Sequence, residues 1–163
     1  MARKERKTSL GHKGFDFNFE KDVTLEEDLY RRDLTINAIA EDKDGNLIDP
    51  FNGLEDIKRK KLKAVSKAFS EDPLRALRVA RFMSQLNGFT LQSDTEDELI
   101  KISEKKELYD LSRERVWEEV TKALHHDFLK FLKVITKYKL QEPWFSNLDN
   151  VPKEIPISIH KEN

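Results

Sequence analysis

The feature of this sequence that most limits its fold is a nearly unbroken run of helical signals after residue 70. Pro73 stands where the first turn of a helix tolerates proline, because an N–H would have no partner there. Ser93 and Glu96 have the spacing of a capping box, and Ser112 can cap a further helix that reaches about residue 125. We therefore predict that residues 65–140 form an almost wholly helical unit.

The last of these predicted helices carries a regular apolar stripe. Asp127 can cap it. The apolar residues at helical spacing on one face are Phe128, Phe131, Leu132, Ile135 and Tyr138. Such a stripe is typical of a core rather than of a binding site. Periodicity stops after Leu140, so we expect an irregular tail over residues 141–163, with Trp144 and Phe145 exposed.

The first half mixes short strands with helical segments. Phe15, Phe17 and Phe19 alternate, which predicts a strand with three rings on one face. Two interpretations of this strand remain open. It belongs to a larger sheet, or it forms a self-contained hairpin that packs on the helices that follow.

From residue 24 the pattern becomes helical. Thr24 with Glu27 fits a capping box, residues 42–45 predict a turn, and Asn52 can cap a second short helix. Residues 58–63 read as a solvated helix end and strand, and their basic run is weak evidence for nucleic acid. The predicted fold class is α+β, mostly helical.

Composition limits the partners more than the fold. The 163 residues have a net charge of −1 although 37% are charged, so any basic surface must be local. Cysteine is absent, which excludes disulfides and thiolate metal sites. No apolar run approaches the ~20 residues of a membrane helix, and the start has no apolar signal segment. We expect a cytoplasmic protein with no membrane contact.

The predicted helix after residue 73 carries the most informative polar pattern. At 100° per residue, Arg75, Arg78 and Arg81 fall within an arc of about 120°. Leu74 and Phe82 lie in the same arc, so this face is not purely polar. The fork of arginine gives paired hydrogen bonds to phosphate or to a base edge and keeps its charge. The arc could therefore be the floor of a pocket.

Asp72 adds an acceptor to this row of donors. The exocyclic amine of cytosine or adenine donates to a carboxylate, and the ring nitrogen accepts from an arginine. A second interpretation is equally open on spacing alone: an amphipathic helix whose exposed arginines pair with Glu71 or Asp72.

A second polar group lies among apolar residues in the segment 31–39. It contains Arg31, Arg32, Asp33 and Asn37. Asn37 follows Asp33 by four residues, one helical turn, so both side chains can face the same point. Buried polar groups need partners, so this group is either a structural network or a site for a ribose or a triphosphate.

The sequence supplies no other chemistry. Its four histidines show no metal-ligand spacing, and neither a G-x-S-x-G motif nor a P-loop is present. We therefore assign no catalytic residue and no metal ligand to these 163 residues.

Five segments in chain order, within residues 2–124, resemble the class II tRNA nucleotidyltransferases, a family that includes bacterial CCA-adding enzymes and poly(A) polymerases. The segments are RKERK from Arg3, RRDLTINAIA from Arg31, DPFNGLEDI from Asp49, EDPLRALRVARF from Glu71 and SRERVWEE from Ser112. The wording of the second and fourth segments is more similar to the CCA-adding branch.

The resemblance implies a fold and a domain division. Residues 1–64 would be the C-terminal part, a remnant, of a nucleotidyltransferase head with short antiparallel strands. Residues 65–140 would be an all-α neck that holds the nucleotide template and binds RNA, and residues 141–163 would be the tail.

The resemblance also implies roles for individual residues. Those that match Asp72 and Arg75 pair with the incoming CTP or ATP, and those that match Arg32, Arg78 and Arg81 hold its phosphates and base. Arg31, Asp33 and Asn37 would shape the ribose site and link head to neck. The implied reaction transfers CMP and AMP to a tRNA 3′ end, with ATP, CTP and Mg²⁺.

One departure from the family is large. Its members carry a glycine-pair loop and a strand with two aspartates that bind magnesium, and these 163 residues contain no match to either. Two-metal chemistry needs those carboxylates. We expect the chain to be weak or inactive alone, with a separate chain as a candidate supplier of the missing head. Alternatives are a noncatalytic nucleotide- or RNA-binding module and a remnant that does not fold stably.

Overall fold

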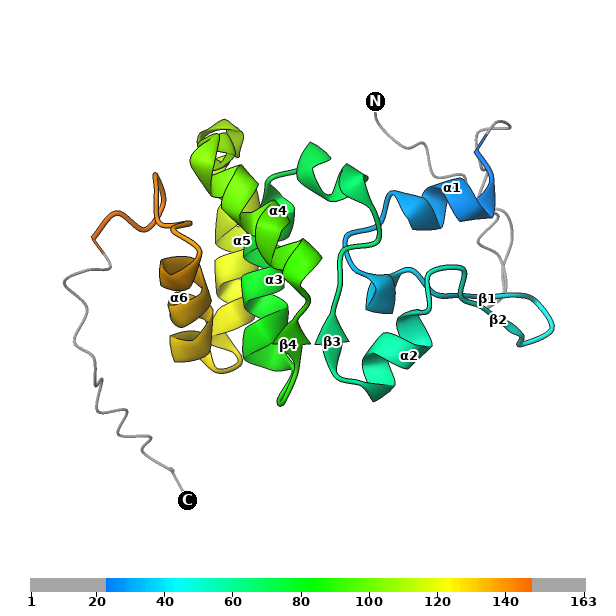
Figure 1. The fold of residues 1–163 in the computed structure, drawn as a ribbon. Helices are drawn as coiled ribbons and strands as arrows, with labels where there is room; N and C mark the ends of the chain where they lie inside the picture. The colour runs from blue at the N-terminus through cyan, green and yellow to red at the C-terminus, as the bar shows by residue number, and fades with distance from the viewer. Residues whose placement is uncertain (1–22, 148–163) are drawn as a thin grey trace, which may run out of the picture.

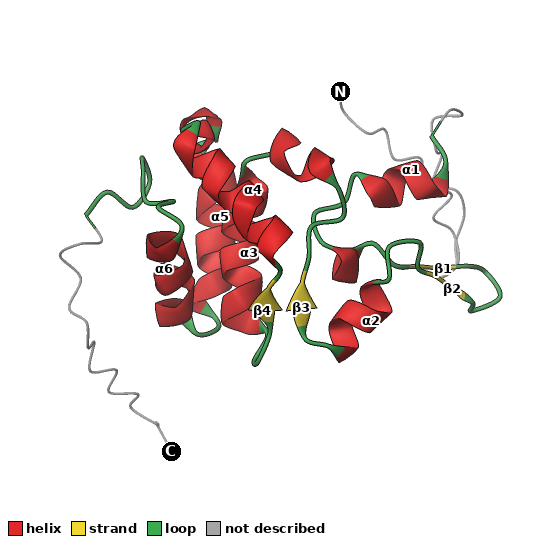
Figure 2. Ribbon diagram, viewed as in Figure 1, coloured by secondary structure: helices red, strands yellow, loops and turns green. Residues whose placement is uncertain are grey.

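The structure is a computed structural model that describes residues 23–147. Short helices and strands of the first part lie on one side, and four longer helices lie on the other (Figure 1, Figure 2). The strands β3 and β4 lie between the two groups. The predicted α+β, mostly helical class is confirmed.

The first part begins with helix α1, Leu25–Tyr30. The predicted capping box is present, because the Thr24 hydroxyl accepts from the Glu27 backbone N–H and the Glu27 carboxylate accepts from that of Thr24. A 3₁₀ helix follows at Thr35–Asn37. The strands β1 (Ala40–Glu41) and β2 (Leu47–Ile48) then form an antiparallel hairpin around the predicted turn.

Helix α2, Gly53–Lys58, is capped differently from the prediction. Asn52 occupies the N-cap position with a left-handed φ of 59°, but its side chain caps nothing. The Asp49 carboxylate accepts from the backbone N–H groups of Gly53 and Leu54 instead. A side chain at Gly53 would collide with the Thr35 carbonyl, since an added Cβ would lie 2.1 Å from that oxygen. Glycine therefore lets α2 pack directly against the 3₁₀ helix.

The two parts of the chain are joined through β3, Lys61–Leu62. It pairs in parallel with β4, Thr90–Leu91, which comes after helix α3 in the sequence. Parallel strands need such a crossover, so this pair differs from the short antiparallel strands that we expected. An antiparallel bridge between Leu34 and Ala64 ties the first part to the same strand segment.

The second part contains the predicted helices. Their bounds are Leu74–Gln85 for α3, Ser93–Glu104 for α4, Arg113–Leu124 for α5 and Phe128–Lys137 for α6. Two 3₁₀ helices, Lys67–Glu71 and Glu107–Asp110, precede α3 and α5. Helix α3 packs against both α5 and α6. The hydrophobic core lies between these helices.

Most of the predicted caps and the apolar stripe are confirmed. Ser112 caps α5, and Asp127 caps α6. In the stripe, Phe131 and Ile135 are fully buried and Tyr138 is nearly so. Burying an aromatic ring of this kind contributes about 1.5–3 kcal/mol. The stripe is therefore core, as its spacing indicates.

Two expectations for the second part are wrong. Ser93 is the first helical residue of α4 and the N-cap is Gln92, so the predicted capping box between Ser93 and Glu96 does not form. Trp144 and Phe145 are half-buried and pack on the core. The Trp144 indole N–H donates to the Leu108 carbonyl at 2.8 Å, which satisfies its polar edge while the ring is covered.

Two other expectations lie outside the described residues. One is the strand that carries Phe15, Phe17 and Phe19, and with it the basic segment from Arg3. The other is the part of the tail beyond residue 147.

Candidate functional site

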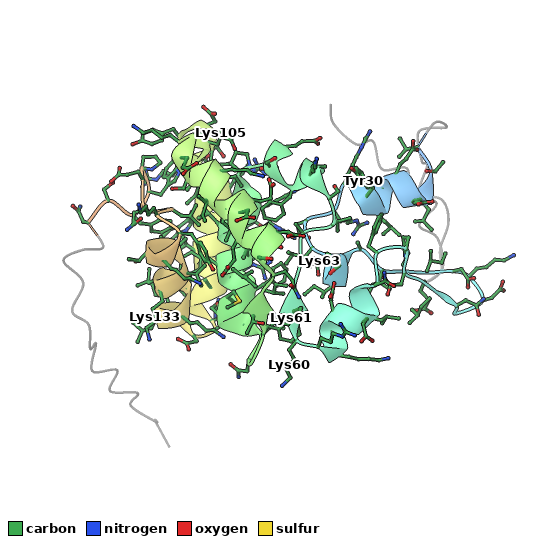
Figure 3. The ribbon with its side chains drawn as sticks, in the orientation of Figure 1. Tyr30, Lys60, Lys61, Lys63, Lys105 and Lys133 are labelled. Atoms are coloured by element: carbon green, nitrogen blue, oxygen red, sulfur yellow. The ribbon has the colours of Figure 1, made fainter. Side chains whose placement is uncertain are left out.

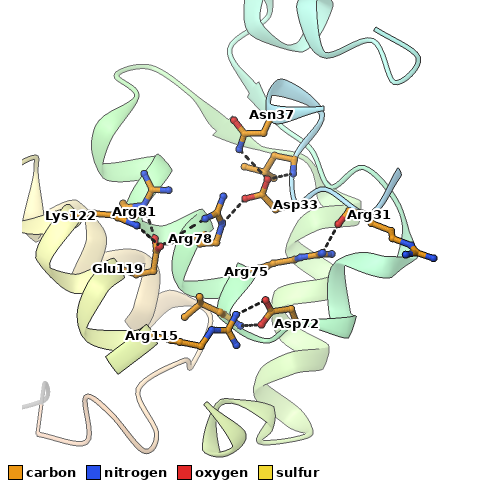
Figure 4. A network of polar contacts seen from close by, with 12 residues as sticks. Arg31, Asp33, Asn37, Asp72, Arg75, Arg78, Arg81, Arg115, Glu119 and Lys122 are labelled. Carbon is orange, nitrogen blue, oxygen red and sulfur yellow. Dashed lines mark hydrogen bonds and ion pairs between the residues drawn. The ribbon is translucent and has the colours of Figure 1, made fainter. Parts of the chain in front are cut away.

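The arginine face of α3 is held by acceptors from other elements. Arg78 Nε donates to Asp33 Oδ2 at 2.7 Å, and Arg81 Nε donates to Glu119 Oε2 at 2.6 Å (Figure 4). Neither guanidinium pairs with Glu71 or Asp72 among the contacts that residues 23–147 make. The alternative of a solvated face with local ion pairs is therefore wrong for Arg78 and Arg81.

Glu119 on α5 is the residue that sequence reasoning missed. It is 2% exposed and contacts three cations. Its carboxylate lies 2.6 Å from Arg81, 3.3 Å from Lys122 and 3.9 Å from Arg78. A buried carboxylate is stable as an ion only with such partners. The sequence signal that could have identified Glu119 is its position on the apolar side of the predicted helix. It comes four residues after Arg115 and three after Val116, which is buried.

The arginine face includes an aromatic ring, as the shared arc predicted. The Arg81 guanidinium lies 4.1 Å from the centre of the Phe82 ring, and that of Arg78 lies 5.8 Å from it. Cations stack favourably on such a ring. Phe82 therefore helps to hold both arginines in place.

Asp33 joins the first part of the chain to this face. Its carboxylate accepts from Arg78, from the Asn37 side chain at 3.0 Å and from the Leu34 backbone N–H at 2.8 Å. The contact predicted between Asp33 and Asn37 is thus present. It forms across a bridge and a 3₁₀ turn rather than within an α-helix.

The environment of Asp33 lowers its pKa. Burial acts in the opposite direction, but the hydrogen bond from Asn37 and the charge and hydrogen bond of Arg78 outweigh it. A carboxyl group whose pKa is lower in the folded state stabilises the fold above its unfolded pKa of about 3.9, and this contribution is lost as the pH falls through the folded pKa.

This pKa shift predicts a pH-dependent effect of Asp33→Asn. The variant should be clearly less stable than the parent at pH 7, and the difference should shrink as the pH falls below about 4. Urea unfolding followed by circular dichroism between pH 7 and pH 3 measures it. Asp28→Asn is the control, because Asp28 pairs with Arg32 while half exposed. A difference between Asp33→Asn and parent that does not change with pH would contradict the role of the charge.

Arg75 is anchored by main-chain oxygens. Its two terminal nitrogens donate to the carbonyls of Ala68 and Arg31, which come from the 3₁₀ helix before α3 and the segment after α1. Arg75 as a whole is half-buried. It therefore links both parts of the chain and is fixed in direction before any ligand arrives.

Asp72 lies beside Arg75 at the start of α3 (Figure 4). Its Oδ2 accepts from Arg115 of α5 at 2.7 Å, and its Oδ1 accepts from the Leu74 backbone N–H at 3.2 Å. The Asp72 and Arg115 side chains are 34% and 48% exposed. Exposed ion pairs of this kind are worth about 0–1 kcal/mol, so a ligand can replace Arg115 at small cost.

Two predicted site residues are not drawn into these contacts through their side chains. Arg32 pairs with Asp28 of α1 at 2.9 Å, and both are about half exposed. Arg31 contributes its main-chain carbonyl. Among the remaining predicted residues, Asp33 contacts Asn37 and Arg78 directly, and Glu119 joins Arg78 to Arg81. Asp72 and Arg75 make separate contacts, with Arg115 and with main-chain carbonyls (Figure 4).

The described residues do not fit a magnesium site. No group of three or more His, Cys, Asp or Glu side chains in residues 23–147 is arranged to hold a metal ion. A hard cation needs several oxygen ligands close together. In the same range, no helix has the length and hydropathy that a membrane crossing requires.

Two protein families match separate parts of the chain. Residues 2–63 match the family described as poly A polymerase head domain, and residues 88–151 match the one described as probable RNA and SrmB-binding site of polymerase A.

Similar proteins cover between 70% and 98% of the chain. A multifunctional CCA protein of Vibrio cholerae is 48% identical over 98% of this chain, which spans 43% of that protein. The CCA-adding enzyme of Bacillus stearothermophilus in complex with CTP is 42% identical over 70% of this chain and 29% of its own, with a TM-score of 0.64. The Thermotoga maritima CCA-adding enzyme complexed with tRNA is 31% identical over 71% of this chain and 30% of its own, with a TM-score of 0.66.

Proposed function

Because the chain belongs to the family of class II tRNA nucleotidyltransferases and poly(A) polymerases, we propose that it is the nucleotide-recognising part of a CCA-adding enzyme. This part binds CTP or ATP and the tRNA 3′ end during transfer of CMP and AMP. The chain spans less than half of the relatives that it matches. The proposed reaction uses a pair of metal-binding carboxylates that the motifs of these 163 residues do not include. The proposed location is the cytoplasm.

The observation that supports this proposal is the position of Asp72 beside Arg75 at the start of α3, although the two side chains have separate partners. Asp72 is an exposed acceptor whose present partner, Arg115, is easily replaced. Arg75 is held in direction by two carbonyls and keeps an Nε donor and one further N–H on each terminal nitrogen. A carboxylate beside a guanidinium is complementary to cytosine or adenine, because the carboxylate accepts from the exocyclic amine and the guanidinium donates to the ring nitrogen.

The remaining arginines divide into two roles. Arg78 is 33% exposed and can reach a triphosphate while Asp33 holds its Nε. Arg81 is 11% exposed and donates to Glu119 and Gln85. Its main role is therefore to hold the arginine face of α3 in position. Arg32 lies on the exposed side and is free to leave Asp28 for a phosphate, because half-exposed pairs are weak. Arg31, Asp33 and Asn37 join the two parts and shape the ribose side of the site.

We propose the domain division that the sequence predicts. Residues 1–64 form the C-terminal part of the head, residues 65–140 the neck, and residues 141–163 the tail. The head-domain match over residues 2–63 and the position of β3 between the two parts support the first boundary.

The activity of the chain tests this proposal. With CTP, ATP, Mg²⁺ and a tRNA that lacks CCA, the 163-residue chain alone should add no nucleotide, because a carboxylate pair for the two metal ions is not among its motifs. A head fragment with the D-x-D strand, supplied as a separate chain, should restore addition of labelled CMP. Gel analysis of the tRNA measures both. Robust addition by the chain alone would contradict the proposed dependence on an added head.

Poly(A) polymerase activity is the second candidate, since the head-domain match carries that description. The mixture of the chain with the separate head fragment distinguishes these two activities. A CCA-adding enzyme incorporates CMP before AMP, whereas a poly(A) polymerase adds AMP repeatedly. A noncatalytic binding module would bind CTP but would add nothing after mixing.

A further inference from the structure

A row of basic residues runs from the end of α2 through β3 to the next 3₁₀ helix. It consists of Lys58, Arg59, Lys60, Lys61, Lys63 and Lys67, with no acidic residue between positions 57 and 70. The whole chain has a net charge of −1 and this row contributes +6, so the remaining residues together carry a net charge of −7. The row is thus a local excess of positive charge in a chain whose other residues are net acidic. We call these six residues the basic row.

Several cations of the basic row have no anionic partner in the described part of the chain. Arg59 pairs with Glu55, and Lys61 Nζ donates to the Thr90 hydroxyl at 2.9 Å. Lys58, Lys60 and Lys63 are exposed and make no ion pair with a carboxylate in residues 23–147. Their charges are available to a ligand without breaking an existing pair.

The backbone presents these lysines rigidly. The Lys60 and Leu62 carbonyls accept from Thr90 and Gln92, and the Lys63 carbonyl accepts from Thr35. Along β3 the fully buried Leu62 separates Lys61 from Lys63, so these two project from the side away from the core. Figure 3 shows Lys60, Lys61 and Lys63 one after another along this segment. A ligand therefore pays for ordering side chains but not for ordering the main chain.

The basic row is connected to the candidate nucleotide site. The Asp33 carbonyl accepts from Val65, two residues after Lys63, and the Asp33 carboxylate holds Arg78. The same strand segment leads through the 3₁₀ helix to Asp72. An extended polyanion on the basic row would lie against the junction of the two parts.

We infer that the basic row binds the sugar-phosphate backbone of RNA, as a surface separate from the nucleotide site. A linear row of cations, most of them without a carboxylate partner in residues 23–147, fits a chain of regularly spaced phosphates, whose neutralisation releases condensed counterions. This surface lies outside residues 88–151, to which the RNA-binding family description applies. The choice of RNA among polyanions rests on the proposed function.

The test compares three variants of the 163-residue chain. Lys58→Gln, Lys60→Gln and Lys63→Gln together, the basic-row variant, remove three charges from the basic row. Lys60→Gln alone removes one charge from the row, and the control, Lys43→Gln, removes one exposed lysine from the turn between β1 and β2, outside the residues that match the RNA-binding family. The two single variants change net charge equally, and glutamine keeps the unbranched stem. Fluorescence anisotropy of a labelled acceptor-stem minihelix with a single-stranded 3′ end reports binding between 50 and 200 mM KCl.

The basic-row variant should bind the RNA at least roughly tenfold more weakly, with a slope of log K against log salt that is smaller by about 2–3. Lys60→Gln should bind roughly twofold more weakly than the parent, whereas Lys43→Gln should bind as the parent does. Equal losses in Lys60→Gln and Lys43→Gln, or an unchanged slope in the triple variant, would overturn the inference. So would displacement of the RNA by poly-L-glutamate as readily as by unlabelled RNA.

A parallel CTP titration separates this inference from the proposed function. The basic-row variant should bind CTP as the parent does, because these lysines are not placed at the nucleotide site. If the parent binds RNA through the basic row but binds no CTP, the proposed function fails and the inference stands. If it binds CTP and the basic-row variant still binds RNA normally, the inference fails alone.

Discussion

Replacing Glu119 with alanine should lower the free energy of unfolding by about 3–5 kcal/mol, the usual cost of removing one partner from a buried ion pair. The substitution leaves Arg81, which is 11% exposed, without its carboxylate at 2.6 Å. It also opens a void where a side chain that is 2% exposed packed between α3 and α5. Urea unfolding followed by circular dichroism measures the loss.

The neighbouring residue offers a matched control. Glu118 pairs with Lys122 at 2.8 Å, but its side chain is 66% exposed. Glu118→Ala should therefore cost at most about 0.5 kcal/mol. Glu119→Gln, which keeps the size and an acceptor oxygen, should fall between the two. If Glu119→Ala and Glu118→Ala differ by less than about 1 kcal/mol, the buried carboxylate does not hold the arginine face.

The second large effect concerns nucleotide binding. Arg75→Glu should weaken CTP binding at least roughly 100-fold, because it removes charge-assisted hydrogen bonds worth about 1.5–3 kcal/mol each and places a like charge beside Asp72. Isothermal titration of the 163-residue chain with CTP measures the change. CTP binding that survives the charge reversal would exclude Arg75 as a reader of the base.

Folding must be separated from binding in this experiment. Arg75 also donates to the carbonyls of Ala68 and Arg31, so its loss can loosen the junction of the two parts. Arg59→Glu is the charge-matched control, since Arg59 pairs with Glu55 on α2 and should leave CTP binding unchanged. Titrations are run at a temperature at which circular dichroism shows each variant folded.

Asp72→Asn provides an independent reading of the same pair that does not depend on Arg75. The parent should prefer CTP to UTP, because uracil lacks the exocyclic amine that donates a hydrogen bond to the carboxylate. Asp72→Asn should reduce this preference. A preference that is unchanged in Asp72→Asn would leave the carboxylate without a role in base selection.

The stability and binding effects share one physical origin. Asp33, Arg78, Glu119 and Arg81 form a chain of contacts that runs from the first part of the molecule through α3 to α5. Arginines held on two sides lose little freedom when a ligand arrives, which favours tight and directed binding.

Much of the helical part could be predicted from local signals. Spacing and caps determine where a helix forms, and they correctly placed α5, α6 and the stripe around Phe131. The three arginines of α3 were recognised for the same reason, since helical geometry alone puts them on one face. The contact between Asp33 and Asn37 was also correctly predicted, although the backbone between them is not α-helical.

Tertiary structure decided which acceptor each of these side chains meets. The partners of Arg75, Arg78 and Arg81 come from positions 31, 33, 68 and 119, which no local spacing connects to them, together with Gln85 of the same helix. The same is true of Trp144, whose indole N–H donates to the Leu108 carbonyl, 36 positions away, and whose ring packs on the core. Local signals report the energy of a few neighbouring residues, whereas burial and ion pairing depend on which distant segments the fold brings together.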